Sequence, residues 1–420
     1  MTKKARRKAP QLRFPEFKGD WKTDRADHFL VRYVNPVDVQ LDTEYEQIGI
    51  RSHGKGIFHK EPVTGRELGN KRVYWVHPEA FTVNIVFAWE QAVALTSDAE
   101  KGFIASHRFL MFLPKENRCD LKFILLFFLR KRGKTLLELA SPGGAGRNKT
   151  LGQDNFAELQ LTLPQKEEQE KIGSFLGLVD TRLTQLRRKH ELLQTYKRGV
   201  MQKIFSQQIR FKSDDGQPFP DWKEKKLGDI ADTNQPHSFT GGPFGSDLKS
   251  SDYTPEGIRV IQLQNIGDGY FLNDYQIFTS EAKANQLISC NIYPNDILLS
   301  KMGDPVARAC IVPNHHERYL MCSDGIRLAV NNKLFNTYFI YSFLNAPVFR
   351  KSAETASSGS TRKRIGLTNL RGLKLACPVL QEQEKIANFL TAIDQKIEAI
   401  AQQIDLTEQF KKGLLQKMFV

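Results

Sequence analysis

The feature that most constrains this chain is an internal repeat. Gln169-Glu170-Lys171-Ile172 recurs 214 positions later as Gln383-Glu384-Lys385-Ile386. The segment Lys149–Phe205 aligns without a gap with the segment Lys363–Phe419. Chance similarity does not sustain a match of that length, so the chain is expected to contain two copies of one structural unit.

A shorter match marks the front of each half of the chain. Arg13-Phe14 and Trp21-Lys22 correspond to Arg210-Phe211 and Trp222-Lys223, whereas the segments between the markers look unrelated. The expected order is variable domain, shared segment, variable domain, shared segment, with about 200 residues in each half. The predicted boundaries give a first variable domain at 1–160, a first shared helix at 161–206, a second variable domain at 207–374 and a second shared helix at 375–420.

The shared segment has the periodicity of a coiled-coil helix, because its apolar residues recur at alternating steps of four and three. Each run follows a proline, Pro164 or Pro378, which disfavours helix before it. We predict two helices of about 40 residues that pair within the chain. The alternative is that each helix packs only on its own domain. The two seams include Ile172, Leu176, Val179 and Leu183 in the first copy and Ile386, Leu390, Ile393 and Ile397 in the second.

The variable regions have strand character and little helical periodicity. Short β-rich runs bounded by Gly, Pro, Asn and Asp occur in both regions. We therefore predict an α/β protein with two globular domains that carry irregular sheets, and leave the strand order open. The runs are 72–76, 81–86 and 108–113 in the first region and 259–263, 296–300 and 327–330 in the second.

The charge balance favours a polyanionic partner. Lys and Arg total 61 against 47 Asp and Glu, which gives a formal charge of +14. Ordinary basic solubility is the alternative explanation. Five scattered cysteines without a C-x-x-C pair indicate neither a disulfide framework nor zinc, and they favour a reducing cytoplasm. The sequence supports neither export nor membrane insertion.

The search for catalytic motifs fails. There is no P-loop and no Asn-Pro-Pro-Tyr motif for amino-methylation, and the Gly143-Gly144-Ala145-Gly146 stretch lacks the context of a dinucleotide fold. Asp221 and Glu224 are too close in sequence to converge on a metal ion from different strands. His315-His316 lacks the spacing that places two ligands on one helix face.

Gly-rich loops that carry cations remain as candidates for DNA contact. Backbone donors, hydroxyls and cations suit phosphate oxygens, and an arginine can also read guanine by a bidentate bond. Lys149 and Lys363 occupy equivalent positions of the repeat, just ahead of each helix. The predicted DNA-binding residues are Arg51, Ser52, His53, Lys55, Arg147, Asn148 and Lys149 in the first half, and Phe244, Ser246, Lys249, Ser360, Thr361, Arg362, Lys363 and Arg364 in the second.

The repeated pattern Pro-x-x-x-Glu-Gln-Glu-Lys-Ile-x-x-Phe-Leu-x-x-x-Asp, at Pro164–Asp180 and Pro378–Asp394, resembles that of the specificity subunits of type I restriction-modification systems. The resemblance covers essentially the whole chain. It implies two target recognition domains that each read one half of a split double-stranded DNA site. It also implies that the two helices form an antiparallel coiled coil that separates the domains. One departure is the loop from Ala140 to Lys149, which lacks the Ser-Thr-Arg-Lys sequence.

The resemblance further implies a non-catalytic chain that binds no metal or cofactor. Two methyltransferase subunits would dock on the helices, and restriction subunits would join the full complex. S-adenosylmethionine, ATP and Mg²⁺ would then be bound by those partners.

Two other classes of function stay open at this point. One is a scaffold protein whose helices bind protein partners and whose basic loops are incidental. The other is a nuclease or methyltransferase with a degenerate site. Sequence-specific DNA binding that survives moderate salt distinguishes the first from a DNA reader, because nonspecific phosphate binding falls steeply as salt rises.

Overall fold

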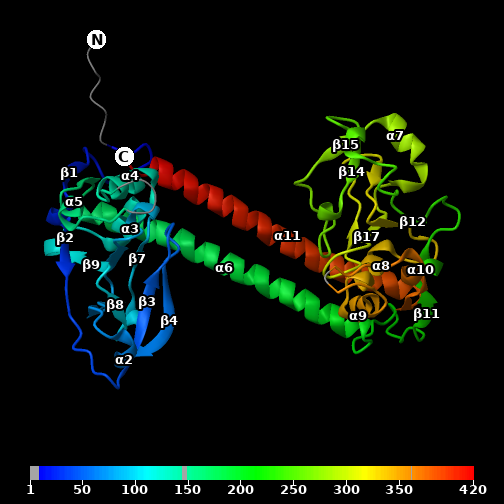
Figure 1. Cartoon of the computed structure of the whole chain (residues 1–420), viewed down its shortest axis with the longest axis horizontal. Helices are drawn as coiled ribbons and strands as arrows, with labels where there is room; N and C mark the ends of the chain where they lie inside the picture. Colours follow the sequence, from blue (N-terminus) through cyan, green and yellow to red (C-terminus); the bar gives the residue numbers. More distant parts are fainter. Residues whose placement is uncertain (1–8, 144–148, 361) are drawn as a thin grey trace, which may run out of the picture. The chain divides into compact units, whose positions relative to one another are not determined.

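The structure is a computed structural model that describes residues 9–143, 149–360 and 362–420 (Figure 1). The chain divides into two compact units. Unit 1 holds the chain up to Arg187 together with Gln402–Val420, and unit 2 holds Arg188–Ala401. The helices α6 (Lys166–Phe205) and α11 (Leu380–Lys417) each contribute to both units. Their lengths of 40 and 38 residues, and their starts two residues after Pro164 and Pro378, confirm the two predicted long helices.

Unit 1 is a mixed α/β structure with two four-stranded sheets and a short two-stranded one. The first sheet is antiparallel, with the order β2 (Leu30–Tyr33), β9 (Phe109–Pro114), β6 (Phe81–Asn84), β7 (Val93–Leu95). The second has the order β4 (Ile57–Thr64), β3 (Glu44–Ile50), β8 (Ile104–Ser106), β5 (Val73–Trp75), and β3 is parallel to β8. The two-stranded sheet pairs β1 (Lys22–Arg25) with β10 (Gln160–Leu163). The helices are α1 (Ala26–Phe29), α2 (Gly65–Leu68), α3 (Leu121–Leu129), α4 (Lys131–Leu139) and α5 (Gln153–Ala157).

Unit 2 contains the corresponding three sheets. The antiparallel sheet has the order β12 (Phe239–Gly241), β20 (Gly325–Leu328), β17 (Ile297–Ser300), β18 (Ala309–Ile311). The five-stranded sheet has the order β13 (Tyr253–Thr254), β15 (Ile277–Thr279), β14 (Ile258–Ile261), β19 (Tyr319–Met321), β16 (Asn291–Ile292), and β14 is parallel to β19. The two-stranded sheet pairs β11 (Lys223–Lys226) with β21 (Lys374–Cys377). The helices are α7 (Glu281–Gln286), α8 (Thr337–Leu344), α9 (Pro347–Thr355) and α10 (Leu367–Gly372).

The two variable regions therefore share one topology although their sequences look unrelated. The order β2-β9-β6-β7 matches β12-β20-β17-β18, and β4-β3-β8-β5 matches β15-β14-β19-β16, including the single parallel pair in each. The helix pairs α3–α4 and α8–α9 follow the corresponding strands. The repeat thus extends over the whole of each half at the level of the fold.

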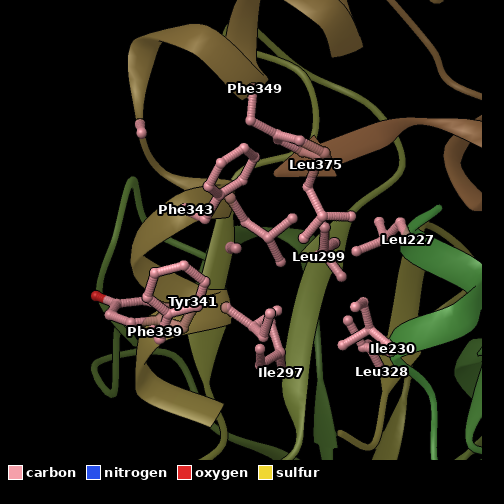
Figure 2. Close-up of a cluster of buried hydrophobic side chains, with 14 of the residues drawn as sticks. Leu227, Ile230, Ile297, Leu299, Leu328, Phe339, Tyr341, Phe343, Phe349 and Leu375 are labelled. Atoms are coloured by element: carbon pink, nitrogen blue, oxygen red, sulfur yellow. The ribbon is translucent and has the colours of Figure 1, made fainter. Parts of the chain in front are cut away.

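All six predicted β-rich runs overlap strands, namely β5, β6, β9, β14, β17 and β20, although the run 327–330 shares only its first two residues with β20. The sequence of the variable regions shows little helical periodicity, yet the structure has the helices α3, α4, α8 and α9 there, within the predicted α/β class. In α3, Phe123, Ile124 and Phe128 are among the buried residues, and α8 is buried along most of its length. A helix that is apolar on nearly every face has no amphipathic stripe for a periodicity search to find. Figure 2 shows Phe339, Tyr341 and Phe343 of α8 in the same core as Ile297 and Leu299 of β17.

The apolar seam residues of both long helices lie inside the units. All eight predicted seam residues are buried or half-buried, and Ile172, Leu176, Ile386 and Leu390 are almost completely buried. The predicted domain boundaries at 160, 206 and 374 stay predictions.

Ion pairs fix the direction of the pairing between the helices. In unit 1, Asp180 of α6 lies 2.5 Å from the amino group of Lys411 of α11, and Arg187 pairs with Glu408 at 2.6 Å. As the numbers rise along α6 they fall along α11, so the two segments are antiparallel. In unit 2, Lys197 of α6 pairs with Asp394 of α11 at 2.5 Å. This is the same pair with the two copies exchanged, because Lys197 and Lys411 occupy equivalent positions of the repeat, as do Asp180 and Asp394.

Candidate nucleic-acid interface

A buried glutamate joins the front of each unit to its long helix. The carboxylate of Glu168 in α6 is completely buried and accepts hydrogen bonds from Nε and Nη2 of Arg13, at 2.8 and 2.7 Å. The indole Nε1 of Trp21 donates to the same carboxylate at 3.3 Å. A bidentate guanidinium–carboxylate pair is among the strongest hydrogen-bonded arrangements in proteins. We call these three residues the unit 1 clamp.

The same clamp is built in unit 2. Glu382 of α11 is completely buried and binds Nε and Nη2 of Arg210 at 2.8 and 2.9 Å, and Nε1 of Trp222 at 3.1 Å. The short match at the front of each half is thereby explained, because its Arg and Trp are the ligands of the repeated glutamate. The sequence contained the repeated Arg and Trp, but it did not reveal that their partner is the repeated glutamate.

The glutamine that follows each clamp glutamate holds a second element. Nε2 of Gln169 donates to the carbonyl of Pro164 at 2.9 Å, and its Oε1 accepts from the backbone N–H of Asp120 at 3.1 Å. Asp120 is the N-cap of α3. In unit 2, Gln383 makes the same bonds with Pro378 and with Asn336, the N-cap of α8. Each buried helix is thus tied to the start of a long helix.

The remaining motif residues also act inside their own unit. Phe175 packs edge-on against Phe14 with ring centroids 5.9 Å apart, and Phe389 packs in the same way against Phe211 at 5.7 Å. The motif lysine of the second copy, Lys385, binds the Asp214 carboxylate at 2.5 Å. The repeated pattern therefore fastens each variable region rigidly to a long helix.

In unit 2 the fold brings the two predicted DNA-binding loops together. Phe244 from the loop after β12 and Arg364 from the loop before α10 line one pocket of about 610 Å³, together with Lys301 and Asp324. The loop after β12 is pressed against the chain, because a Cβ on Gly242 would lie 1.7 Å from the carbonyl oxygen of Cys322. Phe244 projects from it and is 82% exposed.

The two sides of the loop before α10 are joined at Ser358 and Arg364. Backbone hydrogen bonds of 2.9 and 2.8 Å join Ser358 and Arg364 in both directions, and Gly359 between them has a φ of 98°. The guanidinium of Arg364 is held beside the Asp324 carboxylate while half of its side chain stays exposed. This arrangement orients an arginine before any ligand binds.

The other predicted residues of unit 2 differ in their availability. Ser246, Lys249, Ser360 and Arg362 are exposed. Lys363 is half-buried and forms an ion pair with Glu354, which makes it the least available of the predicted cations in this unit. Thr361 lies outside the described residues.

In unit 1, three of the predicted residues, Ser52, His53 and Lys149, lie at the turn Ala88–Glu90. The hydroxyl of Ser52 donates to the Glu90 carboxylate at 3.0 Å, and the backbone N–H of His53 donates to the Glu90 carbonyl at 2.7 Å. The amino group of Lys149 lies 5.5 Å from the ring centre of Trp89 in the same turn. Arg51, His53 and Lys55 are exposed, whereas Arg147 and Asn148 lie outside the described residues.

Comparison with known proteins decides the family. The family model described as "Type I restriction modification DNA specificity domain" matches residues 67–194 and 220–409. The chain belongs to this family. The specificity subunit of the type I restriction enzyme MjaVIII of Methanocaldococcus jannaschii is 23% identical over 96% of this chain and 92% of its own length. The EcoBI specificity subunit of Escherichia coli is 21% identical over 79% of this chain and 70% of its own.

Solved structures share the fold. The type I restriction-modification S subunit from M. genitalium has a TM-score of 0.56 and 17% identity, over 98% of this chain and 99% of that one. A chain from a structure described as the "complex assembly and conformational transition of the type I R-M system" has a TM-score of 0.58 and 18% identity, over 95% and 97%. Membership of the type I specificity family makes the chain a non-catalytic DNA-recognition subunit.

The predicted seam residues are buried or half-buried within the two units, and their role in binding a partner stays a prediction. Six of the eight, namely Ile172, Leu176, Leu183, Ile386, Leu390 and Ile393, are buried, and Val179 and Ile397 are half-buried.

The cysteines of this subunit are structural. All five are free and buried, and burial raises the pKa of the thiols of Cys119, Cys310 and Cys377 to about 12. Thiols with such pKa values stay protonated and unreactive at neutral pH. Across residues 9–143, 149–360 and 362–420, no cluster of His, Cys, Asp and Glu is arranged to hold a metal ion, and no helix is long and apolar enough to cross a membrane.

Proposed function

We propose that unit 1 and unit 2 each read one half of a split double-stranded DNA site. The observation that carries the proposal is that one fold is built twice and fastened twice by the same clamp, while the two sets of candidate loops differ in sequence. A constant scaffold with different loops is the arrangement expected of two readers with different sequence preferences. In unit 2 the reading surface includes Phe244 and Arg364.

The paired helices would act as a ruler between the half-sites. A helix of about 40 residues is about 60 Å long, and one turn of DNA is about 34 Å. Because each variable region is fastened to a long helix, the helix length would set which gap between half-sites is accepted.

The partners follow from the type I specificity family. Two methyltransferase subunits would dock on the two equivalent helix copies, and restriction subunits would join the full complex. S-adenosylmethionine, ATP and Mg²⁺ would be bound by those subunits. A cytoplasmic location is proposed with them, because the substrate is DNA.

Co-expression of the chain with a type I methyltransferase subunit, followed by genome-wide mapping of methylated bases, tests the proposal. A split motif is expected. Exchange of residues 20–160 should change one half of the motif, and exchange of residues 220–374 should change the other. A stable complex that yields no motif would favour the alternative of a non-catalytic scaffold with incidental basic loops.

A further inference from the structure

Phe244 of unit 2 is the most exposed large apolar side chain among the residues that the structure describes. It is 82% exposed, whereas the next, Leu139 and Leu178, are 70% exposed. A single exposed apolar residue needs no explanation by itself, because much of any protein surface is apolar. What distinguishes Phe244 is how its loop holds it and which groups surround it.

The loop after β12 is anchored on both sides of Phe244. Pro243, directly before it, is buried. The carbonyl of Phe244 accepts a hydrogen bond of 2.9 Å from the backbone N–H of Asp247, and Leu248 packs against the core of the five-stranded sheet. The exposed tip is therefore a tight turn with fixed ends. A turn of this kind presents the ring to a ligand in an orientation set before binding.

The surroundings of this ring are cationic. Lys301 and Arg364 line the pocket beside it, and Lys249 is exposed five residues further along the loop. Asp324 in the same pocket is paired with Arg364, which leaves Asp247 as the other carboxylate among the lining residues. An aromatic ring with cations beside it matches nucleic acid, because a stack of bases lies between two phosphate backbones.

We propose that Phe244 is a wedge that enters between two neighbouring base pairs of the half-site read by unit 2 and unstacks them. The inference rests on the proposed function, which supplies DNA as the ligand. Apolar side chains inserted in this way kink the duplex. The energy needed to open a step depends on its sequence, and pyrimidine–purine steps open most readily. Phe244 thereby contributes to sequence preference without a hydrogen bond to a base, while Arg364 reads a base nearby.

The wedge belongs to one unit. The segment between β2 and β3 corresponds to the segment between β12 and β14, and its residues 34–43 include no aromatic residue. Unstacking is therefore expected in the half-site read by unit 2 and not in the half-site read by unit 1. The second half-site thus serves as an internal control on the same duplex.

The fluorescence of aminopurine, which rises when this base analogue loses its stacking neighbours, tests the proposal in the complex of the full chain with methyltransferase subunits. The analogue replaces in turn each adenine of the split site that is not methylated. A position in the half-site of unit 2 should brighten in the wild type and stay dark in Phe244→Ala. Phe244→Leu should keep part of the signal, because leucine also serves as a wedge.

A comparison of binding to intact and abasic duplexes separates a wedge from an ordinary contact. An abasic site at the wedged step opens the stack in advance, so the wild type should gain affinity relative to Phe244→Ala. On the intact duplex, Phe244→Ala should bind about 5- to 150-fold more weakly, the range for the loss of one aromatic–base stack. The matched control is Tyr270→Ala. Tyr270 is 58% exposed, but its ring lies so close to Gly267 that a Cβ there would be 2.8 Å away.

The outcomes distinguish this proposal from the proposed function. If the wild-type complex binds no split site, the proposed function itself fails. If it binds one and the fluorescence at every position is the same in the wild type and Phe244→Ala, the wedge is overturned. Native mass spectrometry of the same complexes tests a protein contact instead, because loss of a methyltransferase subunit from Phe244→Ala would also overturn the wedge.

Discussion

Replacing the clamp glutamate by alanine should destabilise unit 1 far more than any exposed substitution on the same helix. In Glu168→Ala, the guanidinium of Arg13, whose side chain is only 16% exposed, loses its counter-ion, and the indole N–H of Trp21 loses its acceptor. Removing one partner of a buried ion pair costs about 3–5 kcal/mol. In a unit of this size each kcal/mol lowers the melting temperature by about 2–4 °C. The expected loss is therefore about 6–20 °C.

Differential scanning calorimetry of the purified chain measures this loss. The control is Glu170→Ala, because the side chain of Glu170 is 50% exposed and its pair with Lys166, at 3.2 Å, is a surface pair worth less than about 1 kcal/mol. Glu382→Ala should reproduce the effect of Glu168→Ala through unit 2. If Glu168→Ala melts within about 2 °C of Glu170→Ala, the buried carboxylate does not fasten the unit and the reasoning is wrong.

Three further predictions concern the cap, the reading surface and the ruler. Burial raises the pKa of the Asp120 carboxyl above its ordinary value of 3.8, so the folded protein holds this proton more tightly than the unfolded chain does. The wild type therefore loses stability as the pH rises through the raised pKa. Asp120→Asn keeps the cap, as Asn336 does in unit 2, and should gain stability relative to wild type above that range but not at pH 3 in urea titrations. In equilibrium DNA binding, Arg364→Ala should cost about 1–3 kcal/mol of discrimination between bases in the half-site read by unit 2. Phe244→Ala should weaken DNA binding in the same assay without lowering the melting temperature measured by calorimetry. Inserting one heptad into both helices lengthens each by about 10 Å and should change the accepted gap in the methylation motif; an unchanged gap would refute the ruler.

Local periodicity accounts for what the sequence predicted well. The heptad seam, the prolines before each helix and the six β-rich runs are short-range patterns, and each of them coincides with the expected element. The helices α3 and α8 were not predicted from the sequence, because a helix that is buried on nearly all faces has no amphipathic pattern. The common topology of the two variable regions was not predicted either, because many different apolar sequences can fill the same strand positions.

The candidate site shows the same limit. Single loops such as 242–246 and 357–364 were recognisable by their glycines and cations, but their meeting in one pocket of unit 2 depends on strand order. The clamp is a clearer case, because Arg13 and Glu168 are 155 positions apart and hydrogen-bond partners at that distance are chosen by the tertiary fold.

The fastening explains in physical terms how one fold can carry different reading surfaces. The clamp residues of unit 1 lie on both sides of the variable region, with Arg13 and Trp21 before it and Glu168 after it. The strands β1 and β10 pair Lys22 with Leu163, so the chain enters and leaves the variable region at the same place. In unit 2, β11 and β21 do the same.

A region whose two ends are held together can be exchanged as a block without disturbing its support. What the incoming block must supply is small. It needs a strand at each end that pairs with the other. It also needs a backbone N–H at the N-cap of its first buried helix, which donates a hydrogen bond to Gln169 or Gln383. The loops that carry Arg51 or Arg364 are not part of that contact. Their sequences are therefore free to diverge while the helices and the clamp stay the same.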